Sequence, residues 1–369
     1  MTRKDPIYVT KPFLPPFDDF VEGIRKIWDS QILSNHGPIF KELQRCLTDY
    51  LKVDQVSLFV NGHQALEIGL TALELTGEVI TTPFTFASTT HAIVRCGLTP
   101  VFCDIRMSDY NIDETLIESL ITEKTSAILP VHVYGNPCNL EAISRIAEKY
   151  HLRVVYDAAH AFGVQVDGRG IGSFGDLSMF SFHATKVFNT IEGGALTFLD
   201  QELERKLYLL HNFGIAGPEE VLCPGTNAKM NEFQALMGMA SLPYIDQQIA
   251  KRKSKIELYR ALLGGVEGIR MIPENTEIHS NYAYFPILID EKRYGMARDE
   301  LFSLLASHNI FARKYFYPLV PNYECYRGKY RADVPVANYV ADRIVTLPLW
   351  SDISDDTIDE ICQVIVGRR

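Results

Sequence analysis

The sequence has no run of about eighteen apolar residues and no cluster of lysines and arginines long enough to follow a nucleic-acid backbone. The missing apolar run argues against a membrane-spanning helix, and the first residues carry no apolar segment of the kind that directs export. The missing basic cluster, together with a formal charge of −10, argues against a nucleic-acid backbone as the main partner. We therefore expect neither membrane nor nucleic acid among the partners.

Paired cysteines are missing as well. The seven cysteines are scattered, and no two of them form a Cys-x-x-Cys pair. An odd number of cysteines without such pairs favours neither a disulfide framework nor a zinc site. They indicate reduced thiols in the core of a cytoplasmic protein, and we predict no metal.

The sequence does have the composition of an ordinary folded enzyme, with 47% hydrophobic and 22% charged residues over 369 positions. A chain of this length is too long for one small core, so we predict two domains. A helical stretch from Asn231 to about Leu263, interrupted at Pro243, carries the chain from one to the other. The predicted domains are a large α/β domain with an N-terminal arm over 1–245 and a smaller C-terminal α+β domain over 246–369.

The first half of the chain alternates short apolar runs with helical periodicity, which is the pattern of a wound α/β domain. A strand at 56–60 is expected to run through the turn at Asn61 into a helix at 64–75, and a helix capped by Asn139 should end near Tyr150. Further strands are predicted at 78–82, 99–104, 127–132, 152–157, 193–198, 284–288 and 313–317, with a closing helix at 355–366.

Two residues of opposite charge stand out against apolar surroundings. Asp157 ends the run 152–157, and the carboxyl end of a parallel strand faces the crevice where α/β sheets bind ligands. Lys186 lies among apolar, aromatic and hydroxylic residues, so desolvation favours the neutral amine that attacks a carbonyl. Singly, they could be a turn residue and a surface lysine. Together they match the Schiff-base lysine and pyridine-nitrogen acid that pyridoxal 5'-phosphate requires.

The turn after the strand at 56–60 is the predicted phosphate site. Free N–H groups and the helix dipole favour an anion at a helix N-terminus, which makes Gly62, His63 and Gln64 candidate cofactor-binding residues. Ser181, five positions before the lysine, could add a hydroxyl from the same side. The alternative is a plain strand-to-helix turn.

A literal G-x-G-x-x-G occurs at Gly170-Ile-Gly172-Ser-Phe-Gly175. A dinucleotide-binding fingerprint follows a strand and opens a helix, whereas this segment leads into the strand-like run 177–182. We therefore predict a tight loop here, and an oxidoreductase is the less favoured alternative.

Several segments occur together in a specific order: Asp157-Ala-Ala-His160, Gly172-Ser-Phe-Gly-Asp176, Phe180-Ser-Phe-His-Ala-Thr-Lys186 and Glu192-Gly-Gly194. With them the sequence resembles the DegT/DnrJ/EryC1/StrS family of sugar aminotransferases over nearly its whole length. The resemblance implies pyridoxal 5'-phosphate as cofactor and an aspartate-aminotransferase-like fold of type I. That fold has a large domain with a mixed, mostly parallel sheet and a smaller C-terminal α+β domain.

The resemblance also implies residue roles beyond the catalytic pair Lys186 and Asp157. Phe86 would stack on the pyridine ring, with a core phenylalanine as the alternative, and His160 would contact the ring hydroxyl. Asn227 would reach the phosphate held by the neighbouring subunit, which implies a homodimer with shared active sites. The family usually has Thr where this chain has His63, so the imidazole either contributes to phosphate binding or turns elsewhere.

The implied reaction is transfer of an amino group from L-glutamate to a nucleotide-linked keto sugar. The segments 11–16, 133–138 and 183–190 are most similar to family members that aminate C4 of dTDP-4-keto-6-deoxy-D-glucose. A transaminase that aminates C3, or one that acts on a UDP-4-keto sugar, stays open. A non-catalytic protein of the same fold that binds a sugar nucleotide is the alternative from a different class.

Overall fold

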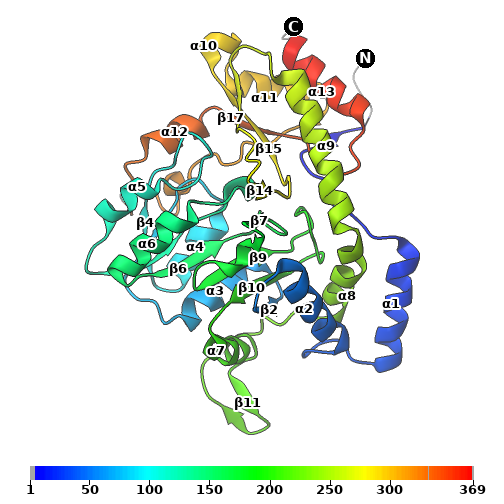
Figure 1. The fold of residues 1–369 in the computed structure, drawn as a ribbon, viewed down its shortest axis with the longest axis vertical. Coiled ribbons are helices and arrows are strands. Elements are labelled where there is room, and N and C mark those ends of the chain that lie inside the picture. The colour runs from blue at the N-terminus through cyan, green and yellow to red at the C-terminus, as the bar shows by residue number, and fades with distance from the viewer. Residues whose placement is uncertain (1–4, 331, 368–369) are drawn as a thin grey trace.

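The computed structural model describes residues 5–330 and 332–367, which contain a central seven-stranded sheet (Figure 1). In spatial order its strands are β2 (Gln55–Phe59), β10 (Gly194–Phe198), β9 (Leu177–Ser181), β6 (Arg153–Asp157), β5 (Thr125–Leu129), β3 (Glu78–Thr81) and β4 (Thr99–Phe102). Strands β9, β6, β5, β3 and β4 pair in parallel, whereas β10 runs against both of its neighbours. The predicted mixed, mostly parallel sheet is confirmed, and the strand predictions in the first half agree to within a few residues.

Helices cover both faces of this sheet. They are α2 (Pro38–Leu51), α3 (Gly62–Ala72), α4 (Ala87–Arg95), α6 (Leu140–Tyr150), α7 (Gln201–His211) and α8 (Glu232–Ser241). The helix α1 (Phe17–Ser30) lies outside this layer and packs against α8, where Gly23 meets Leu236 (Figure 1). Along β6, Val155 packs into the core that α3 helps to form, while Val154 and Tyr156 pack into the core beside α6. Both faces are therefore buried, which explains why these strands read as nearly continuous apolar runs.

The helix α9 (Ile245–Leu263) connects the central sheet to a second core (Figure 1). Ile249 packs beside the sheet, and Ile256 packs with β15 (Phe285–Ile289), β17 (Ile344–Leu347) and α13 (Asp355–Gly367). The predicted helix interruption is confirmed, because a turn of 3-10 helix at Leu242–Tyr244 separates α8 from α9. The domain boundary near 245 stays a prediction.

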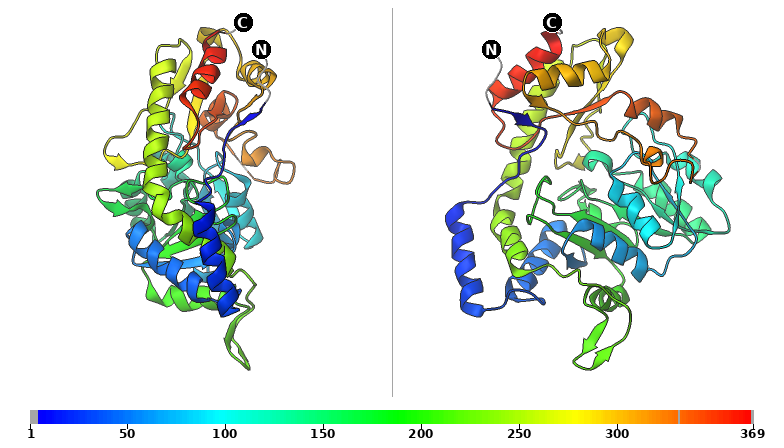
Figure 2. Two further views of the ribbon diagram at one scale, coloured as in Figure 1. Left: turned by 90° about the vertical axis from the view of Figure 1, so that its right-hand side faces the viewer. Right: turned by 180° about the vertical axis from the view of Figure 1, so that it is seen from behind.

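The smaller antiparallel sheet has the order β13-β15-β17, where β13 is Ile269–Met271. The start of the chain lies against this part of the molecule, since β1 (Ile7–Tyr8) pairs in parallel with β16 (Ile310–Phe311) (Figure 2). No helix within the described ranges is long and apolar enough to cross a membrane. All seven cysteines lie within these ranges and are free.

The strand predicted at 313–317 is wrong. Arg313 forms only an isolated bridge with Thr346, and the residues after it turn away from the sheet. The aromatic residues that suggested a strand pack instead as a cluster, in which Phe316 lies 5.5 Å from the ring of Phe84 and 6.2 Å from that of Tyr134. Their apolar side chains therefore pack within a loop and do not form one face of a sheet.

The glycine motif forms a tight loop that leads into β9, as predicted. A side chain at Gly170 would place its Cβ 1.7 Å from the carbonyl oxygen of Leu51, so only glycine allows the two backbones to approach. Gly175 has a φ of +75°, which residues with a side chain rarely adopt. Close backbone packing and a positive φ therefore explain both glycines, and neither one implies a bound nucleotide.

We expect Gly170→Ala to lower the free energy of unfolding by about 3 kcal/mol, because the added methyl group overlaps a backbone carbonyl. Gly265→Ala is the matched control, since a Cβ there has open space around it, and it should change stability by less than about 0.5 kcal/mol. Urea midpoints of the two variants measure the difference. Equal midpoints would contradict the close approach of Gly170 to Leu51.

Candidate active site

Asp157 lies at the carboxyl end of β6 with only 4% of its surface exposed. The hydroxyl of Thr89 donates to Oδ2 at 2.8 Å, and the backbone N–H of Ala159 donates to Oδ1 at 3.1 Å. Burial raises the pKa of the Asp157 carboxyl, while these two hydrogen bonds and the charge of Lys186 act against that rise. The carboxylate is thus held in a dry site with a donor on each oxygen.

Lys186 follows β9 in a turn in which its backbone N–H donates to the carbonyl of His183 at 2.9 Å. Loss of hydration lowers the pKa of its amino group to about 8, and the negative charge of Asp157 limits the fall. The neutral amine is therefore far more abundant near neutral pH than it is for a hydrated lysine. The structure brings the two predicted catalytic residues into one electrostatically coupled site.

His160 is buried, and its Nδ1 accepts the backbone N–H of Tyr134 at 3.2 Å. Because Nδ1 accepts a hydrogen bond, the proton of the neutral ring is on Nε2. Burial, followed by the charge of Lys186, holds the pKa of the imidazole well below its usual value. His160 is therefore a neutral ring that presents an N–H donor at Nε2, which suits contact with a ring hydroxyl.

The predicted phosphate turn is the first turn of α3. The side chain of Asn61 accepts the backbone N–H of Gln64 at 2.8 Å, so that amide already has a partner. The amides of Gly62 and His63 donate to no other group among the described residues and are available to an anion. A Cβ on Gly62 would lie 3.0 Å from the Cβ of Ser181, which places this turn directly beside the end of β9.

The side chain of His63 turns away from its own turn toward neighbouring helices. Its Nδ1 lies 2.9 Å from the hydroxyl of Ser88 on α4, and its Nε2 lies 3.2 Å from Oε1 of Glu67. The Glu67 carboxylate also pairs with Arg95 and accepts a hydrogen bond from Gln64. Of the two alternatives for this imidazole, the geometry favours the one in which it links α3 to α4.

Phe86 is not a core residue. It is 61% exposed and immediately precedes α4, the helix that carries Thr89 to Asp157. Its ring is therefore free to cover a ligand above the carboxylate. Asn227 is also exposed, in a loop where it bridges to Asn212 after the hairpin of β11 (Ile215–Gly217) and β12 (Glu220–Val221). The roles of both residues stay predictions.

Sequence reasoning missed two contributors to the site. Tyr284 places its hydroxyl 3.5 Å from Nζ of Lys186, and Thr89 donates to Asp157. Tyr284 begins the apolar run that predicted β15, so its position could be found, but the run does not say that the ring meets the lysine. Nothing in the sequence marks Thr89 as a site residue except its position one helical turn after Phe86.

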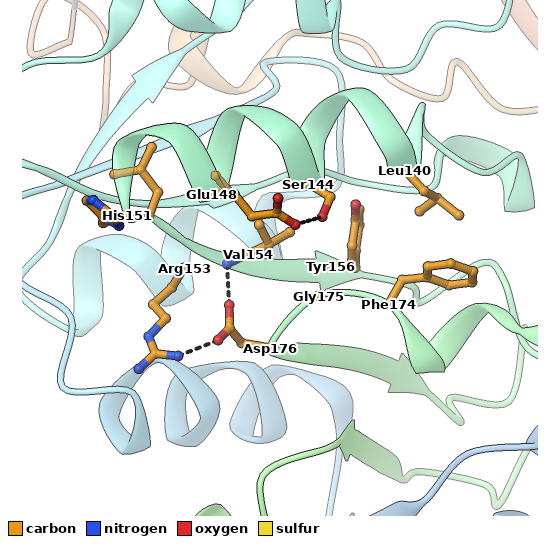
Figure 3. A pocket seen from close by; sticks show the side chains of 12 residues that line it. Leu140, Ser144, Glu148, His151, Arg153, Val154, Tyr156, Phe174, Gly175 and Asp176 are labelled. Atoms are coloured by element: carbon orange, nitrogen blue, oxygen red, sulfur yellow. Dashed lines mark hydrogen bonds and ion pairs between the residues drawn. The ribbon is translucent and has the colours of Figure 1, made fainter.

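A cavity elsewhere on the molecule lies between α6 and the amino ends of β6 and β9 (Figure 3). At its floor Asp176 accepts the backbone N–H of Val154 at 2.8 Å and pairs with Arg153, the first residue of β6. Asp157 is the last residue of the same strand. The cavity therefore opens at the opposite edge of the sheet from the predicted site.

The groups around Lys186 fit the chemistry of pyridoxal 5'-phosphate. The amine matches its aldehyde, the buried Asp157 carboxylate matches a protonated pyridine nitrogen, and the neutral His160 donor matches the ring hydroxyl. At the α3 turn, Gly62 has no side chain and lies against Ser181. The groups that this residue offers to a phosphate are therefore backbone amides.

Known proteins resemble this chain over its full length. The sequence model of the DegT/DnrJ/EryC1/StrS aminotransferase family matches residues 18–366. The dTDP-4-amino-4,6-dideoxy-D-glucose transaminase of Escherichia coli is 45% identical over 368 residues, which cover 98% of each chain. The crystal structure of DesI in the presence of its TDP-sugar product superposes with a TM-score of 0.95 at 35% identity, covering 99% of this chain and 93% of that one. The PLP-form of Spr1654 from Streptococcus pneumoniae has a TM-score of 0.91 at 25% identity and 98% coverage of each chain.

We expect Asp157→Asn to raise the urea midpoint of the cofactor-free protein at pH 7 while it abolishes activity. Burial raises the folded-state pKa above the ordinary 3.8, so keeping this carboxylate ionised costs stability as pH rises through that folded-state pKa. The amide carries no such cost. Below the folded-state pKa the wild-type carboxyl takes up a proton, and the gap between the two proteins should close.

The control is Asp54→Asn, which changes an exposed carboxylate and should leave the urea midpoint at pH 7 close to that of wild type. A urea midpoint for Asp157→Asn below that of wild type at pH 7 would contradict the prediction. It would mean that the hydrogen bonds and the charge of Lys186 stabilise the Asp157 carboxylate by more than burial destabilises it.

Proposed function

The chain belongs to the DegT/DnrJ/EryC1/StrS aminotransferase family of pyridoxal-phosphate-dependent enzymes, and we propose that it transfers an amino group from L-glutamate to a nucleotide-linked keto sugar. The observation that carries this proposal is the Lys186 amine, whose pKa is lowered to about 8 beside the buried Asp157 carboxylate. An amine of that kind can both bond to a carbonyl carbon and carry a proton.

We infer that the acceptor is dTDP-4-keto-6-deoxy-D-glucose, which would give dTDP-4-amino-4,6-dideoxy-D-glucose. Support comes from the transaminases of that name in Escherichia coli and Shigella dysenteriae, which match nearly the whole chain. The TDP-sugar product bound to DesI is the same class of ligand. Incubation with glutamate and a panel of dTDP-, UDP- and GDP-linked keto sugars, followed by mass and NMR analysis of the products, tests the nucleotide and the aminated carbon.

Bound pyridoxal 5'-phosphate supplies an aldehyde that exchanges amino groups and a protonated ring that withdraws electrons. In our proposal Lys186 holds the cofactor until the amino donor displaces it. Its freed Nζ then takes the α-proton of L-glutamate and, in the second half of the cycle, moves a proton in the reverse direction at the sugar carbon. A pKa near 8 suits this task, since Nζ must both accept and release a proton near neutral pH.

The remaining side chains hold the cofactor in this proposal. Asp157 keeps the pyridine nitrogen protonated, and His160 donates from Nε2 to the ring hydroxyl. Phe86 covers one face of the ring. The phosphate binds the α3 turn at Gly62, His63 and Gln64, through free amides at the first two and with Gln64 contributing its side chain, and the Ser181 hydroxyl adds a contact from β9.

Asn227 lies on an exposed loop, and we propose that it completes the phosphate site of a second copy of the chain. Exposed apolar side chains on α1 and around the β11–β12 hairpin fit burial in such a homodimer; they include Phe17, Trp28, Phe213, Val221 and Leu222. The active sites of this dimer would then be shared between subunits. We further propose that the enzyme works in the cytoplasm, in keeping with its free thiols.

Lys186→Ala should abolish turnover and the visible absorbance of the bound cofactor, because the variant lacks the amine that bonds to the cofactor and transfers the proton. Lys206→Ala is the control, since Lys206 forms an exposed ion pair with Glu74, and both properties should stay at wild-type level. Absorbance spectra and glutamate-dependent product formation measure the outcome. Normal turnover by Lys186→Ala would refute the assignment.

A mixing experiment tests the shared site. Asn227→Ala should weaken cofactor binding, and dimers that combine this variant with Lys186→Ala contain one site with both native residues and one with neither. A mixture of equal parts should therefore regain about a quarter of the wild-type sites, as a two-fold interface requires. Activity equal to the average of the two parents would mean that Asn227 serves its own subunit.

A further inference from the structure

The hydroxyl of Tyr284 lies within hydrogen-bond distance of the Lys186 amine. Its Oη lies 3.5 Å from Nζ, whereas Nζ is 5.9 Å from the centre of the Tyr284 ring. The hydroxyl end of the ring therefore faces the amine. His160, Tyr134 and Tyr315 surround the ring, with centroids 4.7, 5.9 and 6.1 Å away, and this packing restricts where the hydroxyl can point.

Arg252 lies behind Tyr284 on the buried side of α9 and is 5% exposed. Its Nη1 donates to the carbonyl oxygen of Ala283 at 3.4 Å and to that of Leu349 at 3.5 Å. No carboxylate of the described residues forms an ion pair with it. A buried guanidinium without an acid is costly, so its presence points to a task that a neutral side chain does not perform.

The place of Arg252 in α9 suggests that task. One turn before it, Ile249 packs beside the central sheet, and one turn after it, Ile256 packs in the C-terminal core. Arg252 thus lies at the junction of the two cores and binds the backbone of the residue that precedes Tyr284. Burial raises the pKa of the Tyr284 hydroxyl to about 12, and the charge of Arg252 opposes that rise. The phenol stays neutral and can donate or accept.

We propose that Tyr284 is a catalytic residue whose hydroxyl holds the freed Lys186 amine in place for proton transfer, and that Arg252 is a positioning residue that acts on Lys186 only through Tyr284. This inference rests on the proposed function, because it takes Lys186 as the proton carrier. When Nζ takes the α-proton it becomes an ammonium, and Tyr284 Oη accepts a hydrogen bond from it. When Nζ is the neutral amine, the hydroxyl donates to it, so Tyr284 keeps its own proton throughout.

Tyr284→Phe should lower the rate of the glutamate half-reaction by about tenfold to a hundredfold, the effect of losing one hydrogen bond to a charged group. The matched control is Tyr282→Phe, two residues away, whose hydroxyl donates to the carboxylate of Glu274 at 3.3 Å. Stopped-flow absorbance of single turnovers measures both rates. A rate for Tyr284→Phe within about twofold of the control would overturn the proposal.

A second measurement uses the protein without cofactor. Labelling of Lys186 by an amine-reactive anhydride, followed by mass spectrometry over a pH series, reports the midpoint at which its amine loses its proton. Wild type should titrate near pH 8, and Tyr284→Phe should titrate lower, because an ammonium gains more from a hydroxyl acceptor than a neutral amine does. General loosening of the site would hydrate the amine and raise the midpoint, and that result would also overturn the proposal.

The role of Arg252 is tested by a double-mutant cycle. Arg252→Met should slow the half-reaction, and Arg252→Lys, which keeps a charge and a donor, should restore part of the rate. The double variant Arg252→Met/Tyr284→Phe should be no slower than Tyr284→Phe alone, since Arg252 acts through that hydroxyl. Additive losses would mean that Arg252 only supports the fold. Activity of Lys186→Ala would refute the proposed function itself, which these tyrosine and arginine variants do not test.

Discussion

The removal of one carboxylate and one amine from water, at the same edge of a parallel sheet, is the constraint on which the active site depends. Dehydration pushes the pKa of Asp157 up and that of Lys186 down, and their mutual attraction limits both shifts. The pKa of each group is thereby shifted from its ordinary value in the direction that favours the neutral form. Neither residue would have this property on the surface, where hydration restores ordinary pKa values.

A few elements of the fold exclude water from this edge of the sheet. Strands β6 and β9 are buried on both faces, so the residues that follow them enter a site already lined by apolar side chains. The helix α4 then has two tasks, because it carries Thr89 to the carboxylate and presents Phe86 at its exposed beginning. The contact of His63 with Ser88 ties this helix to the phosphate turn of α3. Cofactor ring and cofactor phosphate would therefore rest on one rigid unit.

Those parts of the site that lie within short segments could be predicted from the sequence. The strand that ends at Asp157, the turn before α3 and the apolar setting of Lys186 are local patterns, and the structure bears out their placement. The roles of Tyr284 and Arg252 could not be predicted in this way, since their contacts depend on how α9 and the start of β15 pack against residues that are distant in the sequence. The error at 313–317 has the same origin: apolar aromatic residues suit a strand or a packed loop, and only tertiary contacts decide between them.

The parallel pairing of β1 with β16 has a consequence for how the protein is made. Ile7 leaves the ribosome early but finds its partner Ile310 only after most of the chain has been synthesised. Until then the first strand is an unpaired edge, which invites contact with other chains. The joining of these two strands is therefore a late event in biosynthesis, and it closes a loop that contains most of the chain. We expect nascent chains stopped before residue 310 to expose the N-terminal arm to proteases that spare the finished protein.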